Sequence, residues 1–532
     1  MSREADREGA PGGRVRETSR VRDASLELDT GESEALAARA FALAAEYFAR
    51  APERRVFPET SARDLTRRFR TPVPAEPAPL EELFDDCRAV FDASRNHFSP
   101  RMFGYVASPA APAGAYAALL AAALNQNVTA WRSAPAATEI EHTVVRWLAE
   151  LICYAGASVD DGESDAAREC GGLLTSGGSM ANLVALHVAH RFTSGRAREL
   201  SNRGLRDEDA PAALYVSDQV HLSIPKAADL LGLGREQVRV VASDENFRMD
   251  VRALGALIED DRRAGLRPFC VVASAGTVAT GAVDALADVA RVARDAGLWF
   301  HVDGAYGALA ALDERKRPLF AGIGLADSVS LDPHKWLYAP LDCGCLILRD
   351  PARARLAFGA SEGDYIKVYE REEAEAFAFW DYGMELSRPF RAFKVWMMLR
   401  YYGARRVARC VAEDNALAAY MGELVEASEG FELLAPVNLS ICCFRCVPLD
   451  ARRALEQTID DDERETINAR LDRFNERLMH KIQRGGEAYL SNASLRGRFA
   501  LRACVTNFRT TRADIRATLD AVRRAAEEVD PW

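Results

Sequence analysis

A lysine and an aspartate each stand where an apolar run of the sequence ends. Asp303 closes the run 299–303 and precedes Gly-Ala-Tyr-Gly, and Lys335 stands in Asp-Pro-His-Lys-Trp after the run 328–332. Burial lowers the pKa of a lysine, and a neutral amine can form a Schiff base with an aldehyde. A strand-end carboxylate can pair with a protonated pyridine nitrogen. Each residue also has an ordinary interpretation, because strand-end lysines are commonly exposed and aspartates commonly cap helices.

A turn of small residues precedes both of them in the chain. Residues 175–182 are Thr-Ser-Gly-Gly-Ser-Met-Ala-Asn, and helical apolar spacing follows. Backbone N–H groups of such a turn can bind a phosphate at the helix N-terminus, although the same pattern is typical of ordinary capping. It lacks the GxxxxGKS spacing of a nucleoside triphosphate loop. His221, after the run 214–217, could stack on a flat ring or be a buried structural histidine. The order of turn, histidine, aspartate and lysine indicates pyridoxal phosphate (PLP) as cofactor.

The elements that position these residues alternate between two types of pattern. Short apolar runs rich in β-branched residues alternate with helical spacing, which favours an α/β fold with a mainly parallel sheet covered by helices. Ligands of such sheets bind beyond the carboxyl ends of the strands, where these polar residues stand. The predicted strands cover 214–217, 238–242, 270–274, 299–303, 328–332 and 344–348, and the predicted helices cover 180–192, 223–231, 251–263 and 285–296.

The chain divides into four predicted segments. Residues 1–30 are polar and charged, as in a disordered tail, and residues 31–113 form a helical arm with a Pro-rich stretch at 71–79. Residues 114–395 contain the sheet pattern and form the large domain. Residues 396–532 form a small C-terminal domain of helices and strands.

The composition excludes several classes of function. The net charge is −11 and no run approaches the roughly 20 apolar residues of a membrane span, so neither nucleic acid nor a membrane is expected as a partner. Eleven cysteines in a long chain without a secretory signal favour buried thiols and a cytoplasmic location. His187 and His190 share a helix, but no further ligand accompanies them. We therefore expect no metal site.

These blocks resemble the group II PLP-dependent amino acid decarboxylases, which act on aromatic amino acids, glutamate, cysteine sulfinate or 2,4-diaminobutyrate. The resemblance runs from about Phe91 to the C-terminus and includes the segments 131–141, 276–284 and 488–511. It implies a fold-type I (aspartate aminotransferase-like) large domain, an obligate homodimer, and α-decarboxylation of an L-amino acid to an amine and CO2. The sequence departs from the family pattern at Val278, where a second threonine is common, and at Gly304, where alanine is frequent.

The resemblance also implies roles for individual residues. Lys335 would carry PLP as a Schiff base, Asp303 would pair with the pyridine nitrogen, and His221 and Ala305 would lie on opposite ring faces. The residues expected around the phosphate and the Schiff base are Gly178, Ser179, Ser330, Asp332 and His334. Tyr365 resembles the tyrosine that protonates the substrate Cα. Without that proton the carbanion can react with oxygen, so an aldehyde synthase is an alternative.

The substrate pocket is expected from the N-terminal part of the resemblance. Its predicted residues are His97, Phe103, Tyr105, Ser108, Thr129 and Trp131. Their mixed apolar character favours an aromatic or bulky apolar amino acid. Glutamate remains an alternative because Arg101 or Arg132 could bind a side-chain carboxylate. A diaminobutyrate or aliphatic substrate, or a binding homologue without catalysis, are further alternatives.

Overall fold

The computed structural model describes residues 26–154, 170–207, 210–359 and 375–529. Their contacts define two compact units, one of residues 1–49 and 72–91, the other of residues 50–71 and 92–532. The first unit contains most of α1 (Thr30–Arg50) and α3 (Leu80–Asp92), which pack through the rings of Tyr47 and Phe91. An ion pair of 2.7 Å joins Arg88 to Glu46 across the same two helices. The predicted domain boundaries at residues 30, 113 and 395 stay a prediction.

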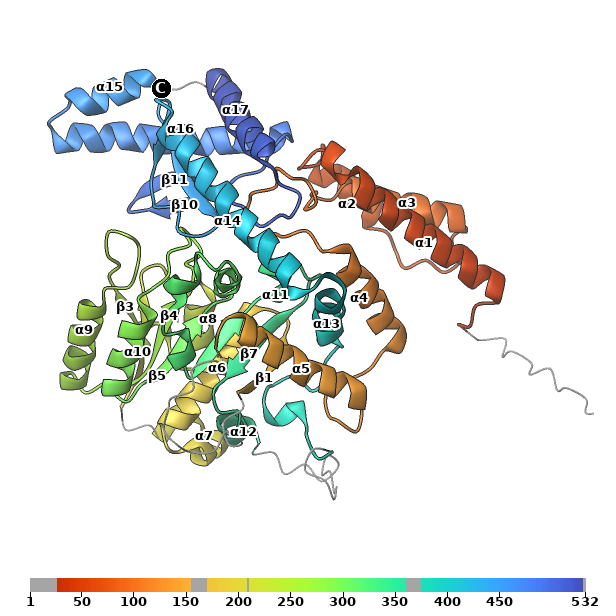
Figure 1. Cartoon of the computed structure of the whole chain (residues 1–532), viewed down its shortest axis with the longest axis horizontal. Coiled ribbons are helices and arrows are strands. Elements are labelled where there is room, and N and C mark those ends of the chain that lie inside the picture. Colours follow the sequence, from red (N-terminus) through yellow and green to blue (C-terminus); the bar gives the residue numbers. More distant parts are fainter. Residues whose placement is uncertain (1–25, 155–169, 208–209, 360–374, 530–532) are drawn as a thin grey trace, which may run out of the picture. The chain divides into compact units, whose positions relative to one another are not determined.

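The second unit contains a seven-stranded sheet in the order β1-β7-β6-β5-β4-β2-β3 (Figure 1). Neighbouring strands from β6 to β3 are parallel, and β7 runs antiparallel to both β1 and β6. The predicted mainly parallel sheet is therefore confirmed. Its strands are β1 (Gly171–Thr175), β2 (Ala212–Ser217), β3 (Val238–Val241), β4 (Arg267–Ser274), β5 (Trp299–Asp303), β6 (Ser328–Leu331) and β7 (Gly344–Leu348).

Every residue of β2, β5, β6 and β7 is buried, which indicates that helices cover both faces of this sheet. Each predicted helix agrees with an observed one, whereas α5 and β1 were not predicted. The strand β1 was missed because it is short and follows the acidic, polar stretch at 158–169. The helices of this part are α4 (Pro112–Leu124), α5 (Pro135–Leu151), α6 (Gly178–Thr193), α7 (Ala197–Arg203), α8 (Ser223–Leu230), α9 (Val251–Arg263), α10 (Leu286–Asp295), α11 (Pro333–Trp336), α12 (Ala352–Phe358) and α13 (Arg391–Tyr402).

The strand directions bring five chain segments to one edge of the sheet. Because β7 is antiparallel to both neighbours, β1 points the same way as β6. The carboxyl ends of β1, β2, β4, β5 and β6 therefore meet at a common edge. The register places Ser274 beside Asp303 and Asp303 beside Ser330.

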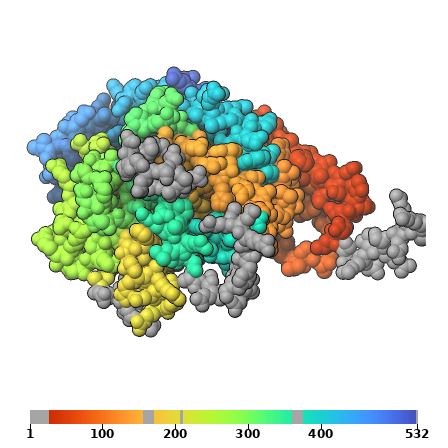
Figure 2. All heavy atoms as spheres, turned by 60° about the horizontal axis from the view of Figure 1, so that its bottom comes forward, coloured from red at the N-terminus to blue at the C-terminus, as the bar shows by residue number. Residues whose placement is uncertain are grey.

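The C-terminal part contains a second, antiparallel sheet in the order β10-β11-β9-β8. Side chains such as Phe444 and Phe474 form its own core against the long helices. In Figure 2 the blue residues of this part adjoin the green residues of the part that contains the large sheet. No helix of the described residues is long and apolar enough to cross a membrane. The elements are α14 (Ala404–Glu426), β8 (Phe431–Leu433), β9 (Ile441–Cys446), α15 (Leu449–Gln457), α16 (Asp461–Gly485), β10 (Ser491–Leu495), β11 (Arg498–Cys504) and α17 (Arg512–Glu528), with α2 (Ala62–Phe69) earlier in the chain.

Candidate active site

A cavity of about 700 Å³ lies at the carboxyl edge of the large sheet. The loops after β1, β2, β4, β5 and β6 line it, together with residues of β10 and β11. The structure thus brings together residues that are far apart in sequence. The predicted site residues in its wall are Tyr105, Gly178, Ser179, His221, Asp303, Ala305, Asp332, His334 and Lys335.

Lys335 lies on the short helix α11, where its amine is held by a carboxylate. Its Nζ is 2.8 Å from Oδ2 of Asp332, whose side chain is 3% exposed. His334 contacts the carbonyl oxygen of Cys343 through Nδ1 at 2.7 Å, and burial lowers the pKa of this imidazole. Ser108, one of the predicted substrate residues, donates a hydrogen bond to the backbone carbonyl of Lys335. These contacts fix the backbone and the amine of Lys335 beside the cavity.

The small-residue turn forms the N-terminus of α6. A β-carbon on Gly178 would lie 2.7 Å from Cβ of Ala305 and 2.9 Å from Oδ2 of Asp332, so a larger residue does not fit without a shift. The first N–H groups of a helix have no partner within the helix and attract anions. Gly178 and Ser179 therefore provide an anion cradle that fits the phosphate of PLP.

The carboxylate of Asp303, at the end of β5, is fixed by hydrogen bonds. Its Oδ2 accepts a hydrogen bond from Asn182 (3.0 Å), and its Oδ1 accepts from the backbone of Ala305 (3.1 Å) and from Ser330 (3.3 Å). The predicted residue Ser330 thus contacts the carboxylate of Asp303 and is absent from the described wall of the cavity. The carboxylate at the cavity fits the pyridine nitrogen of PLP, which needs such a partner to stay protonated.

His221 follows β2 and lies in the cavity wall. Burial lowers the pKa of its imidazole, and the nearby amines of Lys335 and Lys226 lower it further against the opposing effect of Asp303 and Asp332. Its Nδ1 is 2.8 Å from the hydroxyl of Ser223. A neutral, flat ring at this position is suited to stacking.

Arg502 is a wall residue that the sequence did not reveal. This arginine of β11 is 3% exposed, donates through Nε to the carbonyl of Val278 (2.9 Å), and donates through Nη1 to that of Tyr105 (2.8 Å). Its Nη2 has no hydrogen-bond partner, and in the described chain no carboxylate pairs with it. The only signal in the sequence is a charge inside the apolar run 499–504. A buried guanidinium with an unused donor is suited to binding a carboxylate.

The other predicted substrate residues that the structure describes are not part of the cavity wall. Phe103 is fully buried in the core of the small sheet, and Trp131 donates through Nε1 to Glu139 at 2.9 Å. The backbone carbonyl of Thr129 accepts from Phe379, and His97 lies beside Arg95 with its pKa lowered by burial. Their role in substrate binding stays a prediction. Tyr365 lies outside the described residues.

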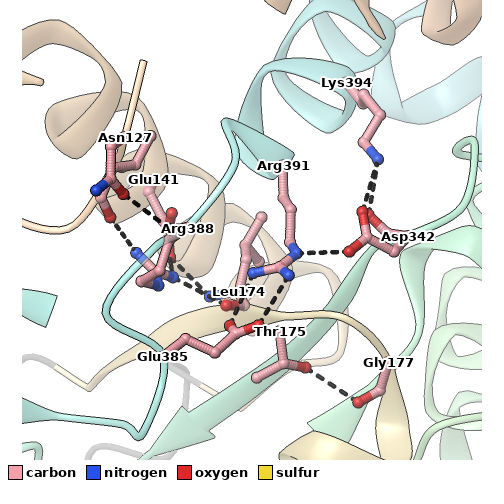
Figure 3. A network of polar contacts seen from close by, with 11 residues as sticks. Asn127, Glu141, Leu174, Thr175, Gly177, Asp342, Glu385, Arg388, Arg391 and Lys394 are labelled. Atoms are coloured by element: carbon pink, nitrogen blue, oxygen red, sulfur yellow. Dashed lines mark hydrogen bonds and ion pairs between the residues drawn. The ribbon is translucent and has the colours of Figure 1, made fainter. Parts of the chain in front are cut away.

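A buried ion pair supports the strand that leads into the anion cradle. Figure 3 shows Arg388 between Glu141 and Leu174. Arg388 pairs with Glu141 and donates to the carbonyl of Leu174 (2.9 Å), while Glu141 accepts from the Leu174 amide (2.8 Å). Thr175, the next residue, donates to the carbonyl of Gly177 at 3.1 Å. The pair therefore fixes the end of β1 directly before the cradle.

No cluster of side chains suited to a metal ion occurs among the described residues. The ring of His187 packs at a tilt against Phe358 and that of His190 packs edge-on against Phe269, and burial lowers their pKa values to about 4 and about 3. Cys442, Cys443 and Cys446 are buried free thiols on and beside the core of the small sheet.

Comparisons with known proteins show the family to which this chain belongs. A family model described as the pyridoxal-dependent decarboxylase conserved domain matches residues 63–447. The chain is 35% identical to an aromatic-L-amino-acid decarboxylase of Bacillus atrophaeus, covering 85% of this chain and 86% of the relative. It is 30% identical to a phenylacetaldehyde synthase of Petunia hybrida, covering 84% and 85%.

The fold is similar to that of TDC of Oryza sativa, solved with PLP and tryptamine. The TM-score is 0.84 at 27% identity, and the match covers 95% of this chain and 99% of the rice protein. The fold-type I architecture, PLP as cofactor and the carboxy-lyase class are therefore established. The chain belongs to the pyridoxal-dependent decarboxylase family.

Proposed function

We propose that this enzyme removes the α-carboxylate of an aromatic or bulky apolar L-amino acid and releases the amine. The observation that carries the proposal is the convergence of Lys335, Asp303, His221 and Arg502 on one cavity. The decarboxylase of Bacillus atrophaeus, which shares 35% identity, supports an aromatic substrate.

Each group has a distinct task in this reaction. When bound, PLP supplies an electron sink for the bond that breaks. Lys335 would hold the cofactor covalently, and the carboxylate of Asp303 would accept a hydrogen bond from the protonated pyridine nitrogen. Arg502 binds and orients the substrate carboxylate through its unused Nη2. Tyr365 delivers a proton to Cα after CO2 has left.

The alternatives concern the side chain of the substrate and the product. Arg502 could instead bind the side-chain carboxylate of an acidic amino acid such as glutamate. The Petunia relative is named an aldehyde synthase, so oxygen could replace the proton at Cα. We favour the amine because the sequence has both His221 and Tyr365. Two further alternatives are a diaminobutyrate or aliphatic substrate and a binding role without catalysis. The experiment described next tests both.

The test is release of CO2 from a panel of the twenty amino acids, diaminobutyrate and cysteine sulfinate. Aromatic substrates should give the highest kcat/KM, with an amine as product and no peroxide. Stoichiometric peroxide and aldehyde would contradict the amine proposal, and preference for glutamate would contradict the substrate proposal. Absence of CO2 from every substrate would favour the binding role.

We also propose that the enzyme is a cytoplasmic homodimer with active sites at the subunit interface. The family resemblance supports the dimer, and the buried free thiols support a reducing compartment. A mass near twice 58.4 kDa in solution is expected, and a monomeric active enzyme would contradict the proposal.

A further inference from the structure

Asn182 stands one helical turn after Gly178 on α6, and its side chain is surrounded by polar partners. It is 1% exposed. Its amide nitrogen lies 3.0 Å from Oδ2 of Asp303 and 2.9 Å from the hydroxyl of Ser223, and its amide oxygen lies 3.0 Å from Nε2 of His301. Both N–H groups and the oxygen of the amide therefore have a hydrogen-bond partner, as is expected for a buried amide.

The carboxylate of Asp303 determines which group donates and which accepts in each of these hydrogen bonds. The carboxylate of Asp303 accepts hydrogen bonds, so Asn182 must present its NH2 group to it. The amide oxygen of Asn182 then faces His301 and needs a donor. That donor is Nε2–H of His301, which leaves Nδ1 of this ring as an acceptor.

The hydrogen bonds on the other side of His301, to Ser328 and Trp299, require the same assignment of donors and acceptors. The indole of Trp299 can only donate, and its Nε1 lies 2.8 Å from the hydroxyl of Ser328. Ser328 can then donate its own proton to Nδ1 of His301 at 2.8 Å. His301 is fully buried, and burial lowers its pKa to about 4, in agreement with a neutral ring.

A second branch leads from Asn182 to His221. Ser223 accepts from the amide of Asn182, so its own hydroxyl proton is available for Nδ1 of His221 at 2.8 Å. The backbone N–H of Ser223 approaches the same Nδ1 at 3.2 Å. With two donors at Nδ1, the proton of the neutral His221 imidazole stands on Nε2.

We infer that Asn182 is a positioning residue that joins Asp303 and His221 into one directional hydrogen-bond network. It orients the carboxylate for the pyridine nitrogen of PLP and, through Ser223, fixes the tautomer of the stacking imidazole. The inference rests on the proposed roles of Asp303 and His221. Supporting groups of this kind commonly change affinity or activity 10- to 100-fold when they are lost.

Two substitutions separate the network from simple packing. Asn182→Ala removes every contact, and Asn182→Asp keeps the shape but places an acceptor against Asp303. We expect both to weaken PLP binding, measured by titration of the absorbance of the bound cofactor, by about tenfold or more. The loss should be larger for Asn182→Asp, because like charges repel. Decreased kcat with a smaller change in KM should accompany it.

Asn475→Ala is the matched control. Asn475 of α16 is fully buried and also makes three hydrogen bonds, to the backbone N–H and carbonyl of Cys446 and to the carbonyl of Leu471. It lies away from the cavity wall, so its loss should lower the melting temperature but leave PLP affinity and kcat unchanged. An equal loss of PLP affinity in Asn475→Ala and Asn182→Ala would overturn the inference.

Ser223→Ala tests the second branch. It removes the hydroxyl at His221 and leaves Asn182 on Asp303, so PLP affinity should stay within about twofold of wild type while kcat falls. Wild-type PLP affinity and kcat in both Asn182 variants would refute the network. A wild-type enzyme that releases no CO2 would contradict the proposed function, whereas the PLP affinities would still decide the role of Asn182.

Discussion

Nζ of Lys335 lies 2.8 Å from Oδ2 of Asp332, three residues earlier in the chain. If Gly178 had a β-carbon, that atom would lie 2.9 Å from the same oxygen. The lysine that we propose to carry the cofactor and the turn that we propose to bind its phosphate therefore meet at one carboxylate. Tight packing at this point explains why a glycine stands at the start of α6.

Lys335→Ala should abolish the covalent attachment of PLP and the turnover of every substrate, because no other described lysine lines the cavity. The visible absorbance of the bound cofactor and CO2 release measure the two effects. Lys394→Ala is the control, since Lys394 is a buried lysine that pairs with Asp342 outside the cavity wall. Its cofactor absorbance should match wild type, and retained turnover in Lys335→Ala would refute the assignment.

Tyr365→Phe should shift the product from amine towards aldehyde. The substitution removes the hydroxyl that we expect to protonate Cα and retains the ring. Amine and peroxide are measured in parallel with the wild-type enzyme. An unchanged ratio of the two products would show that another group delivers the proton.

Arg502→Met should raise KM by roughly 10- to 100-fold, since a charge-assisted hydrogen bond contributes about 1.5–3 kcal/mol. Arg502→Lys should retain part of the affinity because it retains the charge. Arg445→Met is a matched control on the neighbouring strand β9, where Arg445 is buried and pairs with Glu432. A KM that stays at the wild-type value in Arg502→Met would exclude this arginine from carboxylate binding.

Arg388→Met should lower the free energy of unfolding by about 3–5 kcal/mol, because it leaves the buried carboxylate of Glu141 without its partner. The double variant with Glu141→Gln should recover part of this loss. Arg235→Met, which breaks an exposed pair with Asp229, should hardly change stability. Denaturant unfolding measures all three variants, and equal losses in the single and double variants would argue against the ion pair.

Stability should decrease as the pH falls from about 6.5 towards 4. In the folded chain burial lowers the pKa of His301 to about 4, whereas the unfolded chain binds this proton near 6.5. The stabilisation from the neutral ring is therefore complete above pH 6.5 and is lost on acidification, by at most about 3 kcal/mol. His301→Gln should flatten this part of the stability profile. An identical pH dependence in the variant would assign the effect to other groups.

The sequence by itself determined the α/β alternation, the family and the order of the cofactor-binding motifs. Apolar periodicity depends on which face of each element is buried, so the strand that ends at Asp303 and the strand that precedes Lys335 were found to within a few residues. Short motifs such as the turn at Gly178 are contiguous in the chain and need no tertiary information.

Only the tertiary structure decided which distant residues meet. Arg502 reaches the cavity because β11 of the small sheet approaches the loop at Val278, and no local pattern encodes that approach. Asn182 was visible as the last residue of the small-residue turn, but its contacts depend on the packing of α6 against β5 and α8. Long-range packing selects these partners, because a buried polar group must find its hydrogen bonds wherever the fold places them.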